Sequence, residues 1–156
     1  RMAVIQRRDA IDGMNQDQRH NRCFYTSYSE MNEVLNRFAS EAELDNIWMS
    51  AEVQDLKENR LGNRLCEIVS LALNTARKNC IETTPPRGRY IKIRSREMQQ
   101  QMLIKIQFSC DDRIIRKFDK GIVRMRELVE SSGGYLKIQL IEDAGNIRIA
   151  IPDDIK

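Results

Sequence analysis

Residues 90–108 read YIKIRSREMQQQMLIKIQF and contain two runs in which apolar and polar residues alternate. The first run ends at Arg96 and the second begins at Met102, with the polar stretch EMQQQ between them. Successive side chains of a β-strand point to opposite faces of a sheet, so each run has one apolar and one polar face. We therefore expect two neighbouring antiparallel strands with one buried face. The lysines and arginines between the isoleucines would form the solvent-exposed face.

The pattern changes after this hairpin. A helix is expected from about Gly121 to Ser131, because its apolar residues recur at helical spacing. The runs GGYLKIQLIED and NIRIAIP then predict a second hairpin, joined through the turn DAGN.

Upstream of both hairpins, residues 65–80 carry a wide apolar face at helical spacing. Pro85 and Pro86 cannot continue a helix, so this one should end near Cys80. From Leu65 the expected order is helix, strand, strand, helix, strand, strand. That order indicates an α+β sandwich with helices covering one face of a mixed or antiparallel sheet.

The first 60 residues are expected to be helical. Apolar residues recur three and four apart from Met2 to about Phe38, which predicts a long amphipathic helix. Ser40 followed by Glu43 resembles a capping box, so a second helix is expected to begin there and to run through Val53. Two successive helices joined by a short turn would form an antiparallel hairpin.

The sequence therefore predicts two parts: a helical dimerisation segment over residues 1–60 and an α+β domain over residues 61–156, with a junction near Gly62. A chain of 156 residues is long enough for one ordinary domain or for a small domain with a helical extension. The net charge is +3, from 26 basic and 23 acidic residues. So small and interspersed an excess of positive charge argues against a nucleic-acid partner. An unrelated α+β interaction domain that binds nucleic acid stays a weak alternative.

The four cysteines form no CxxC pair and His20 is the only histidine, which argues against a zinc site and against a disulfide framework. Reduced cytosolic thiols fit this pattern. No apolar stretch approaches the roughly 20 residues that span a bilayer. We expect a cytoplasmic protein or a cytoplasmic piece of a larger one.

Three stretches together resemble the ATP-binding domain of sensor histidine kinases, the Bergerat or GHKL fold, over roughly residues 60–152. The subgroup that the sequence looks most like is typified by bacterial peptide-pheromone sensors. The stretches are LCEIVSLALNTARKNC at residues 65–80, RYIKIRSREMQQQMLIKIQFSCDD at 89–112 and KGIVRMRELVESSGGYLKIQ at 120–139. They stand where the family has its N-box helix, the strand pair leading to the nucleotide, and its G-box with the following helix and strand.

The resemblance implies ATP and Mg²⁺ as cofactors and assigns roles on the first of these stretches. Asn74 would help to hold magnesium and phosphate, because an amide oxygen on a rigid helix suits a hard cation. Glu67, seven residues earlier on the same helix face, would be the catalytic or structural acid. Thr75 is the alternative ligand position, since Thr75 and not alanine follows the asparagine. Lys78 would also bind the nucleotide.

The other two stretches would bind the adenine and the phosphates. Asp111 or Asp112 would read the adenine amino group, and Gly121 would let backbone N–H groups approach a phosphate at a helix N-terminus. The sequence departs from the family here, because no glycine lies between these aspartates and Gly121, and Val123 stands where a second glycine is expected. The lid between the two motifs is correspondingly short.

His20 follows Arg19 on the expected first helix, as the phosphoacceptor histidine follows arginine in the family. Asn21 replaces the acid that usually comes next. A neutral imidazole is a competent nucleophile near neutral pH, and an asparagine can still fix its tautomer by a hydrogen bond.

The resemblance implies autophosphorylation on a histidine at the expense of ATP, then phosphotransfer to a response regulator. It also implies a homodimer and a parent protein attached to the membrane. The alternative is a degenerate GHKL module that signals as a protein-interaction dimer without turnover, which the missing glycines and Asn21 favour.

Overall fold

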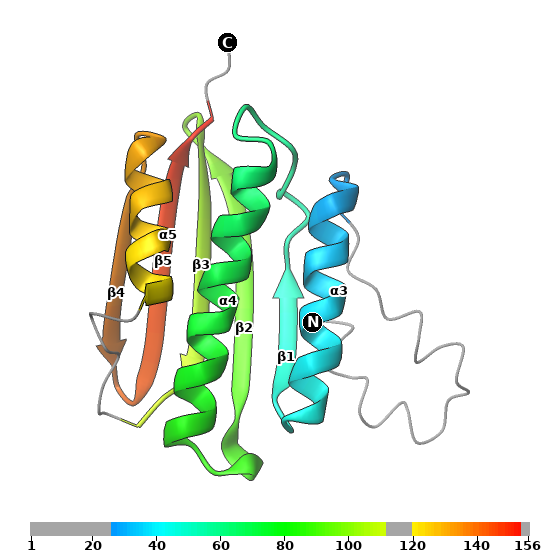
Figure 1. The fold of residues 1–156 in the computed structure, drawn as a ribbon, viewed down its shortest axis with the longest axis vertical. Helices are drawn as coiled ribbons and strands as arrows, with labels where there is room; N and C mark the ends of the chain where they lie inside the picture. Colours follow the sequence, from blue (N-terminus) through cyan, green and yellow to red (C-terminus); the bar gives the residue numbers. More distant parts are fainter. Residues whose placement is uncertain (1–25, 112–119, 154–156) are drawn as a thin grey trace.

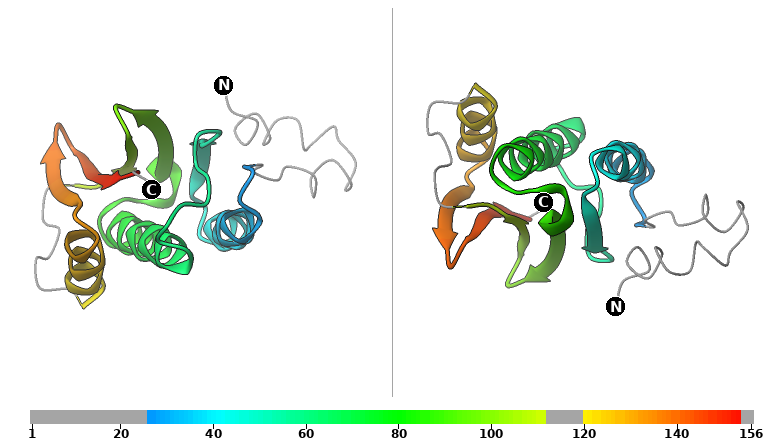
Figure 2. Two further views of the ribbon diagram at one scale, coloured as in Figure 1. Left: turned by 90° about the horizontal axis from the view of Figure 1, so that it is seen from above. Right: turned by 90° about the horizontal axis from the view of Figure 1, so that it is seen from below.

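The computed structural model describes residues 26–111 and 120–153. It contains a five-stranded sheet with three α-helices on one face (Figure 1), and the end-on views of Figure 2 show the two layers. In chain order the elements are α3 (Ser29–Leu44), β1 (Trp48–Glu52), α4 (Asn63–Thr83), the short 3-10 helix η1 (Pro86–Gly88), β2 (Tyr90–Met98), β3 (Gln101–Ser109), α5 (Lys120–Ser131), β4 (Tyr135–Ile141) and β5 (Ala144–Pro152).

The strands lie in the order β1-β2-β3-β5-β4. β1 runs parallel to β2, and all other neighbours are antiparallel, so the sheet is mixed. This arrangement confirms the α+β class, both hairpins, and the helix and strand order expected from Leu65 onward. α4 extends beyond the expected Cys80 to Thr83 and ends before Pro85 and Pro86.

Apolar and polar side chains alternate along the strands and point to opposite faces of the sheet, as expected. Ile93 on β2, Ile106 on β3 and Ile147 on β5 are paired across the sheet and fully buried under the helices. Their sequence neighbours point to the other face, which no helix in the described part of the chain covers.

Both hairpins turn through two residues with positive φ, the geometry that matches strand twist. The first turn is Gln99–Gln100, as the polar stretch predicted. The second is Glu142–Asp143, so this turn is centred two residues earlier than the expected DAGN turn. Gly145 is therefore not a turn residue. It lies in β5 opposite Phe108, and a Cβ atom there would come within 2.2 Å of the Phe108 ring.

The second N-terminal helix was a wrong prediction. Ser40 lies inside α3, which ends in a turn at Asp45 and Asn46, the latter with φ of 59°. Residues 48–52 then form β1 instead of continuing as helix. Met49 is 2% exposed and faces the helices. Pairing with β2 and burial of this side chain override the local helical signal, as tertiary packing often does.

The described part of the N-terminal segment shares its core with the rest of the domain. Tyr28 precedes α3 in an extended conformation, so a helix running unbroken to Phe38 is also excluded. The Tyr28 hydroxyl donates a 2.8 Å hydrogen bond to the carbonyl of Gly62, and Leu35 packs into the common core. The core is thus continuous across residue 60. The division into a dimerisation segment at residues 1–60 and a domain at residues 61–156 stays a prediction, and residues 1–25 lie outside the described residues.

None of the helices in the described ranges combines the length and apolarity that crossing a bilayer requires.

Candidate functional site

Three of the predicted site residues lie on one side of α4. Glu67, Asn74 and Lys78 are spaced by seven and four residues, which places them along one face of the helix. Asn74 and Lys78 are exposed, and Glu67 is half-buried. The side chain of the intervening Arg77 turns instead toward α3, where its Nε lies 2.7 Å from Asp45.

Thr75 follows Asn74 about a quarter of a turn further round α4, on its buried side, and is only 4% exposed. Its carbonyl accepts a 2.8 Å hydrogen bond from the amide of Asn79, which is also buried. Asn74 and Thr75 were the two alternatives for the ligand position, and only Asn74 has its side chain accessible to a ligand.

Glu67 is engaged by a cation from α5. The Arg124 guanidinium donates to both carboxylate oxygens of Glu67, with N···O distances of 3.1 and 3.4 Å. This carboxylate raises the pKa of Arg124 above its ordinary value. The pair joins the N-terminal half of α4 to α5. The sequence left a structural role open for Glu67 but did not identify Arg124 as its partner.

Asp111 is held at the end of β3 by the last turn of α4. Its backbone N–H donates to the Thr83 hydroxyl at 3.0 Å, and this hydroxyl donates in turn to the carbonyl of Asn79 at 2.8 Å. The Asp111 side chain is exposed. Threonine hydroxyls commonly bond to the carbonyl four residues earlier in a helix, so Thr83 could have been identified as a helix residue but not as the anchor of Asp111.

A second set of contacts holds the end of β3 against α4 and the start of β2. The Ser109 hydroxyl accepts the backbone N–H of Tyr90 at 3.2 Å and lies 3.1 Å from the Cys80 sulfur. Burial raises the pKa of the Cys80 thiol, which keeps it protonated. Cys80 therefore packs as a small buried group that ties α4 to the end of β3.

Gly121 is the second residue of α5. α5 runs antiparallel to α4 and lies beside only the part of α4 that is toward its N-terminus (Figure 1). Glu67 contacts Arg124, the fifth residue of α5, so Asn74 and Lys78, seven and eleven residues further along α4, lie beyond the start of α5. The start of a helix carries a partial positive charge, which favours an anion placed there.

The length of α4 between Asn74 and Thr83 shows how large a ligand could lie along this part of the helix. Asn74 and Thr83, the anchor of Asp111, are nine residues apart, which corresponds to about 13 Å along a helix axis. That length is comparable to an extended nucleoside triphosphate.

The residues present fit a cation that arrives with phosphates rather than a metal caged by protein. Among the described residues no three histidine, cysteine, aspartate or glutamate side chains cluster as a metal site. Magnesium is usually bound by one or two protein oxygens together with waters and substrate phosphates. The exposed Asn74 offers one amide oxygen of this kind. His20 and Asp112, the remaining predicted site residues, lie outside the described residues.

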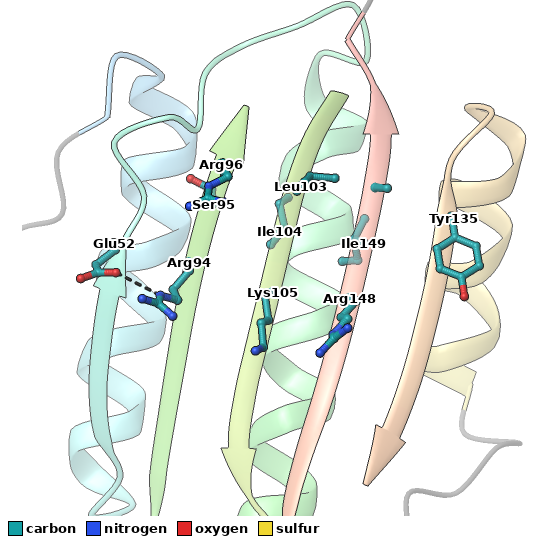
Figure 3. Close-up of a pocket in the computed structure, with 11 residues that line it drawn as sticks. Glu52, Arg94, Ser95, Arg96, Leu103, Ile104, Lys105, Tyr135, Arg148 and Ile149 are labelled. Atoms are coloured by element: carbon teal, nitrogen blue, oxygen red, sulfur yellow. Dashed lines mark hydrogen bonds and ion pairs between the residues drawn. The ribbon is translucent and has the colours of Figure 1, made fainter. Parts of the chain in front are cut away.

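The opposite face of the sheet carries a feature that the sequence did not reveal. A hollow of about 540 Å³ lies over β2, β3 and β5, with basic side chains around it (Figure 3). It is separated from Asn74 by the sheet and the core. The alternation of lysines and arginines with isoleucines was visible in the sequence, but their alignment across strands depends on the strand order.

Comparison with known proteins gives fold matches only. No family model and no curated protein matches the sequence. Solved structures that resemble it include histidine kinase domains, among them the catalytic domain of the histidine kinase ThkA. That domain has a TM-score of 0.60 and 22% identity, with 79% of this chain and 89% of the other covered.

Two further matches come from larger proteins. The histidine kinase domain of a blue-light activated histidine kinase from Erythrobacter litoralis EL346 has a TM-score of 0.63 and 16% identity. The Acinetobacter baumannii histidine kinase AdeS has a TM-score of 0.62 and 13% identity. Each match covers 79% of this chain, which spans 60% of the first structure's chain and 62% of the second. The fold is therefore that of a histidine kinase catalytic domain.

Proposed function

We propose that this chain is the ATP-binding portion of a sensor histidine kinase, with the nucleotide lying along α4 between the start of α5 and Asp111. The observation that carries the proposal is the arrangement of α4. Its exposed side presents Asn74 and Lys78 in the stretch that α5 leaves uncovered, while Thr83 holds Asp111 at the far end of that stretch. The fold match to histidine kinase catalytic domains supports the same placement.

Each residue then has a physical task. The carboxylate of Asp111 accepts a hydrogen bond from the adenine amino group, and backbone N–H groups around Gly121 donate hydrogen bonds to phosphate oxygens. Lys78 offsets phosphate charge, and the Asn74 oxygen ligates the magnesium that the nucleotide brings. Bound there, magnesium neutralises charge that develops during phosphoryl transfer. Glu67 holds α5 through Arg124, and this fixes the position of Gly121.

In the parent protein, His20 would accept the γ-phosphoryl group and pass it to an aspartate of a response regulator. The support is the Arg19–His20 pair in the sequence. We also propose that the chain acts as a homodimer through its N-terminal segment, and that the parent is a membrane-attached sensor of the peptide-pheromone type with this portion in the cytoplasm.

Calorimetric titration with a non-hydrolysable ATP analogue, with and without magnesium, tests the nucleotide site. Magnesium-dependent binding should be lost in Asn74→Ala and kept in Asn63→Ala, a matched variant at another exposed asparagine of the same helix. Binding that both variants keep, or that both lose, would contradict the role of Asn74. The absence of binding at millimolar nucleotide would contradict the nucleotide site as a whole.

Phosphotransfer has its own test. The full chain, incubated with radiolabelled ATP and magnesium, should incorporate label that is stable to base and labile to acid, as expected for a phosphohistidine. His20→Gln should abolish it. Label retained in that variant would place the phosphoacceptor elsewhere.

The second candidate is a degenerate module that binds a partner without turnover. The Glu67–Arg124 pair favours it, because the acid expected to support catalysis is already bound to a guanidinium. Nucleotide binding without label on any histidine, together with a stable homodimer, would favour this function over the kinase.

A further inference from the structure

The uncovered face of the sheet carries a row of charged residues that crosses all five strands. Glu52 of β1 lies opposite Arg94 of β2, and Arg94 lies opposite Lys105 of β3. Lys105 is paired with Arg148 of β5, which is paired with Lys137 of β4. One carboxylate and four cations thus form a single row, which we call the basic row.

The basic row has more positive charge than its own residues can balance. Glu52 accepts a 3.0 Å hydrogen bond from the Arg94 guanidinium. Among the described residues, no carboxylate lies within ion-pair distance of Lys105 or Arg148. Like charges directly opposite each other on neighbouring strands destabilise a sheet. Repulsion between facing cations that no carboxylate of the described residues balances is typical of a binding surface.

The hollow lies beside the basic row. In the next row across the sheet, Arg96 on β2 is paired with Leu103 on β3, which is paired with Ala150 on β5, and Ala150 is paired with Tyr135 on β4. The short side chain of Ala150 leaves space between larger neighbours. Arg94, Lys105 and Arg148 surround the same hollow of about 540 Å³ as Tyr135 and Leu103 (Figure 3).

We propose that this face binds an acidic segment of a partner protein, with carboxylates on the basic row and an apolar side chain over Leu103 and Ala150. The Glu52–Arg94 contact already shows a carboxylate bound by this row. From Arg94 to Lys137 the row crosses three strand spacings, about 14 Å, which an extended segment of four or five residues covers. Guanidinium groups bind carboxylates with two parallel hydrogen bonds, so Arg148 is the strongest free anchor.

The surface suits an acidic protein segment better than single-stranded nucleic acid. Sheets that bind single strands stack bases on aromatic side chains near their centre. Here the centre of the hollow is formed by Leu103 and Ala150. Tyr135, 57% exposed, lies on the edge strand β4. The proposal does not depend on the nucleotide site, which lies on the other side of the sheet.

The test uses a fluorescein-labelled peptide of glutamates with one central leucine, titrated with the full chain at low salt and followed by anisotropy. Binding is expected to weaken as salt rises. The double variant Lys105→Gln with Arg148→Gln should bind at least about fivefold more weakly. Arg64→Gln removes an exposed cation from α4, on the helical side, and should bind as the unchanged chain does.

Amide chemical shifts measured in the same titration locate the site. Changes confined to β2, β3, β5 and β4 support the proposal, and the thermal midpoints of the variants show that they remain folded. Absence of binding at millimolar peptide, or equal loss in Arg64→Gln, would overturn it. Tighter binding of an oligothymidine strand or of phosphatidylserine vesicles than of the peptide would also overturn it, assigning the face to nucleic acid or to anionic lipid.

Discussion

The two faces of the sheet are built from alternate residues of the same strands, yet they differ in what balances them. On the helix side Ile93, Ile106 and Ile147 are buried against α4 and α5, so each apolar group has apolar neighbours. On the open side Lys105 and Arg148 face each other with no described carboxylate beside them. The apolar side chains of the first face find their partners within the chain, whereas the cations Lys105 and Arg148 on the second face have no described carboxylate to balance their charge.

This difference separates residues that stabilise the fold from residues that are available for binding. Burial of apolar surface under helices is the main source of stability. A row of unbalanced cations contributes nothing comparable and costs some electrostatic free energy. Substitutions on the two faces should therefore have effects of opposite sign, and the predictions that follow run from the largest effect to the smallest.

Ile106→Ala should have the largest effect. Ile106 is fully buried between the other two strand isoleucines, and its truncation should lower the free energy of unfolding by about 2–5 kcal/mol. The adjacent Lys105→Ala should change that free energy by no more than about 0.5 kcal/mol. Urea denaturation of both variants measures the difference, and equal effects would contradict the assignment of the two faces.

Gly145→Ala should be the next most destabilising change. The added Cβ atom would lie 2.2 Å from the Phe108 ring, so the ring or the strand must move, at a cost of about 1–3 kcal/mol. Gly88→Ala is the control, because its Cβ atom would approach only the Thr84 methyl group, at 3.3 Å. If thermal unfolding gave the same midpoint for both, Phe108 would not pack over Gly145.

Tyr28→Phe tests how α3 is joined to the helical layer. The Tyr28 hydroxyl donates to the Gly62 carbonyl and accepts from the Cys66 thiol, and its loss should cost about 1 kcal/mol. Burial is the main cause that raises the pKa of Tyr28.

The same tyrosine predicts a pH dependence. Because its folded pKa is raised, its contribution is complete below the unfolded pKa of about 10 and falls as the pH rises above it. Between pH 8 and pH 11 the unchanged chain should lose more stability than Tyr28→Phe does. Parallel curves for the two proteins would show that Tyr28 ionises equally in both states.

Arg148→Gln should have the smallest effect and the opposite sign. Removing one of two cations that face each other should raise the free energy of unfolding by about 0.5 kcal/mol at low salt, and the gain should shrink as salt rises. Arg94→Gln also removes a cation from the basic row but breaks the ion pair with Glu52, so it should show no gain. A loss of stability in Arg148→Gln would mean that the basic row is balanced within the protein.

Much of the fold could be predicted from local patterns. Both hairpins, α4 and α5 follow from alternation and from helical spacing, and each was expected within a few residues of its observed bounds. β1 could not be predicted in this way. Its five residues contain only one deeply buried apolar side chain, and they follow a stretch that resembles a helix start. Its conformation depends on pairing with β2, some 40 residues later in the chain.

The candidate nucleotide site shows the same division. The sequence and its family resemblance supplied Asn74, Lys78, Asp111 and Gly121, but not which residues of α4 are exposed. Burial excluded the Thr75 side chain, and a contact between distant residues engaged Glu67 with Arg124. Such facts depend on helix orientation and on neighbours far along the chain, which no local pattern contains.

By itself, then, the sequence determined which residues are apolar, where strands and helices alternate, and which face of each strand is buried, because these properties depend on residues within a few positions of each other. Only the tertiary structure decided that Trp48–Glu52 is a strand and that β5 lies between β3 and β4. The basic row follows from that order, since Lys105 and Arg148 are 43 positions apart in the sequence and become neighbours only when their strands pair.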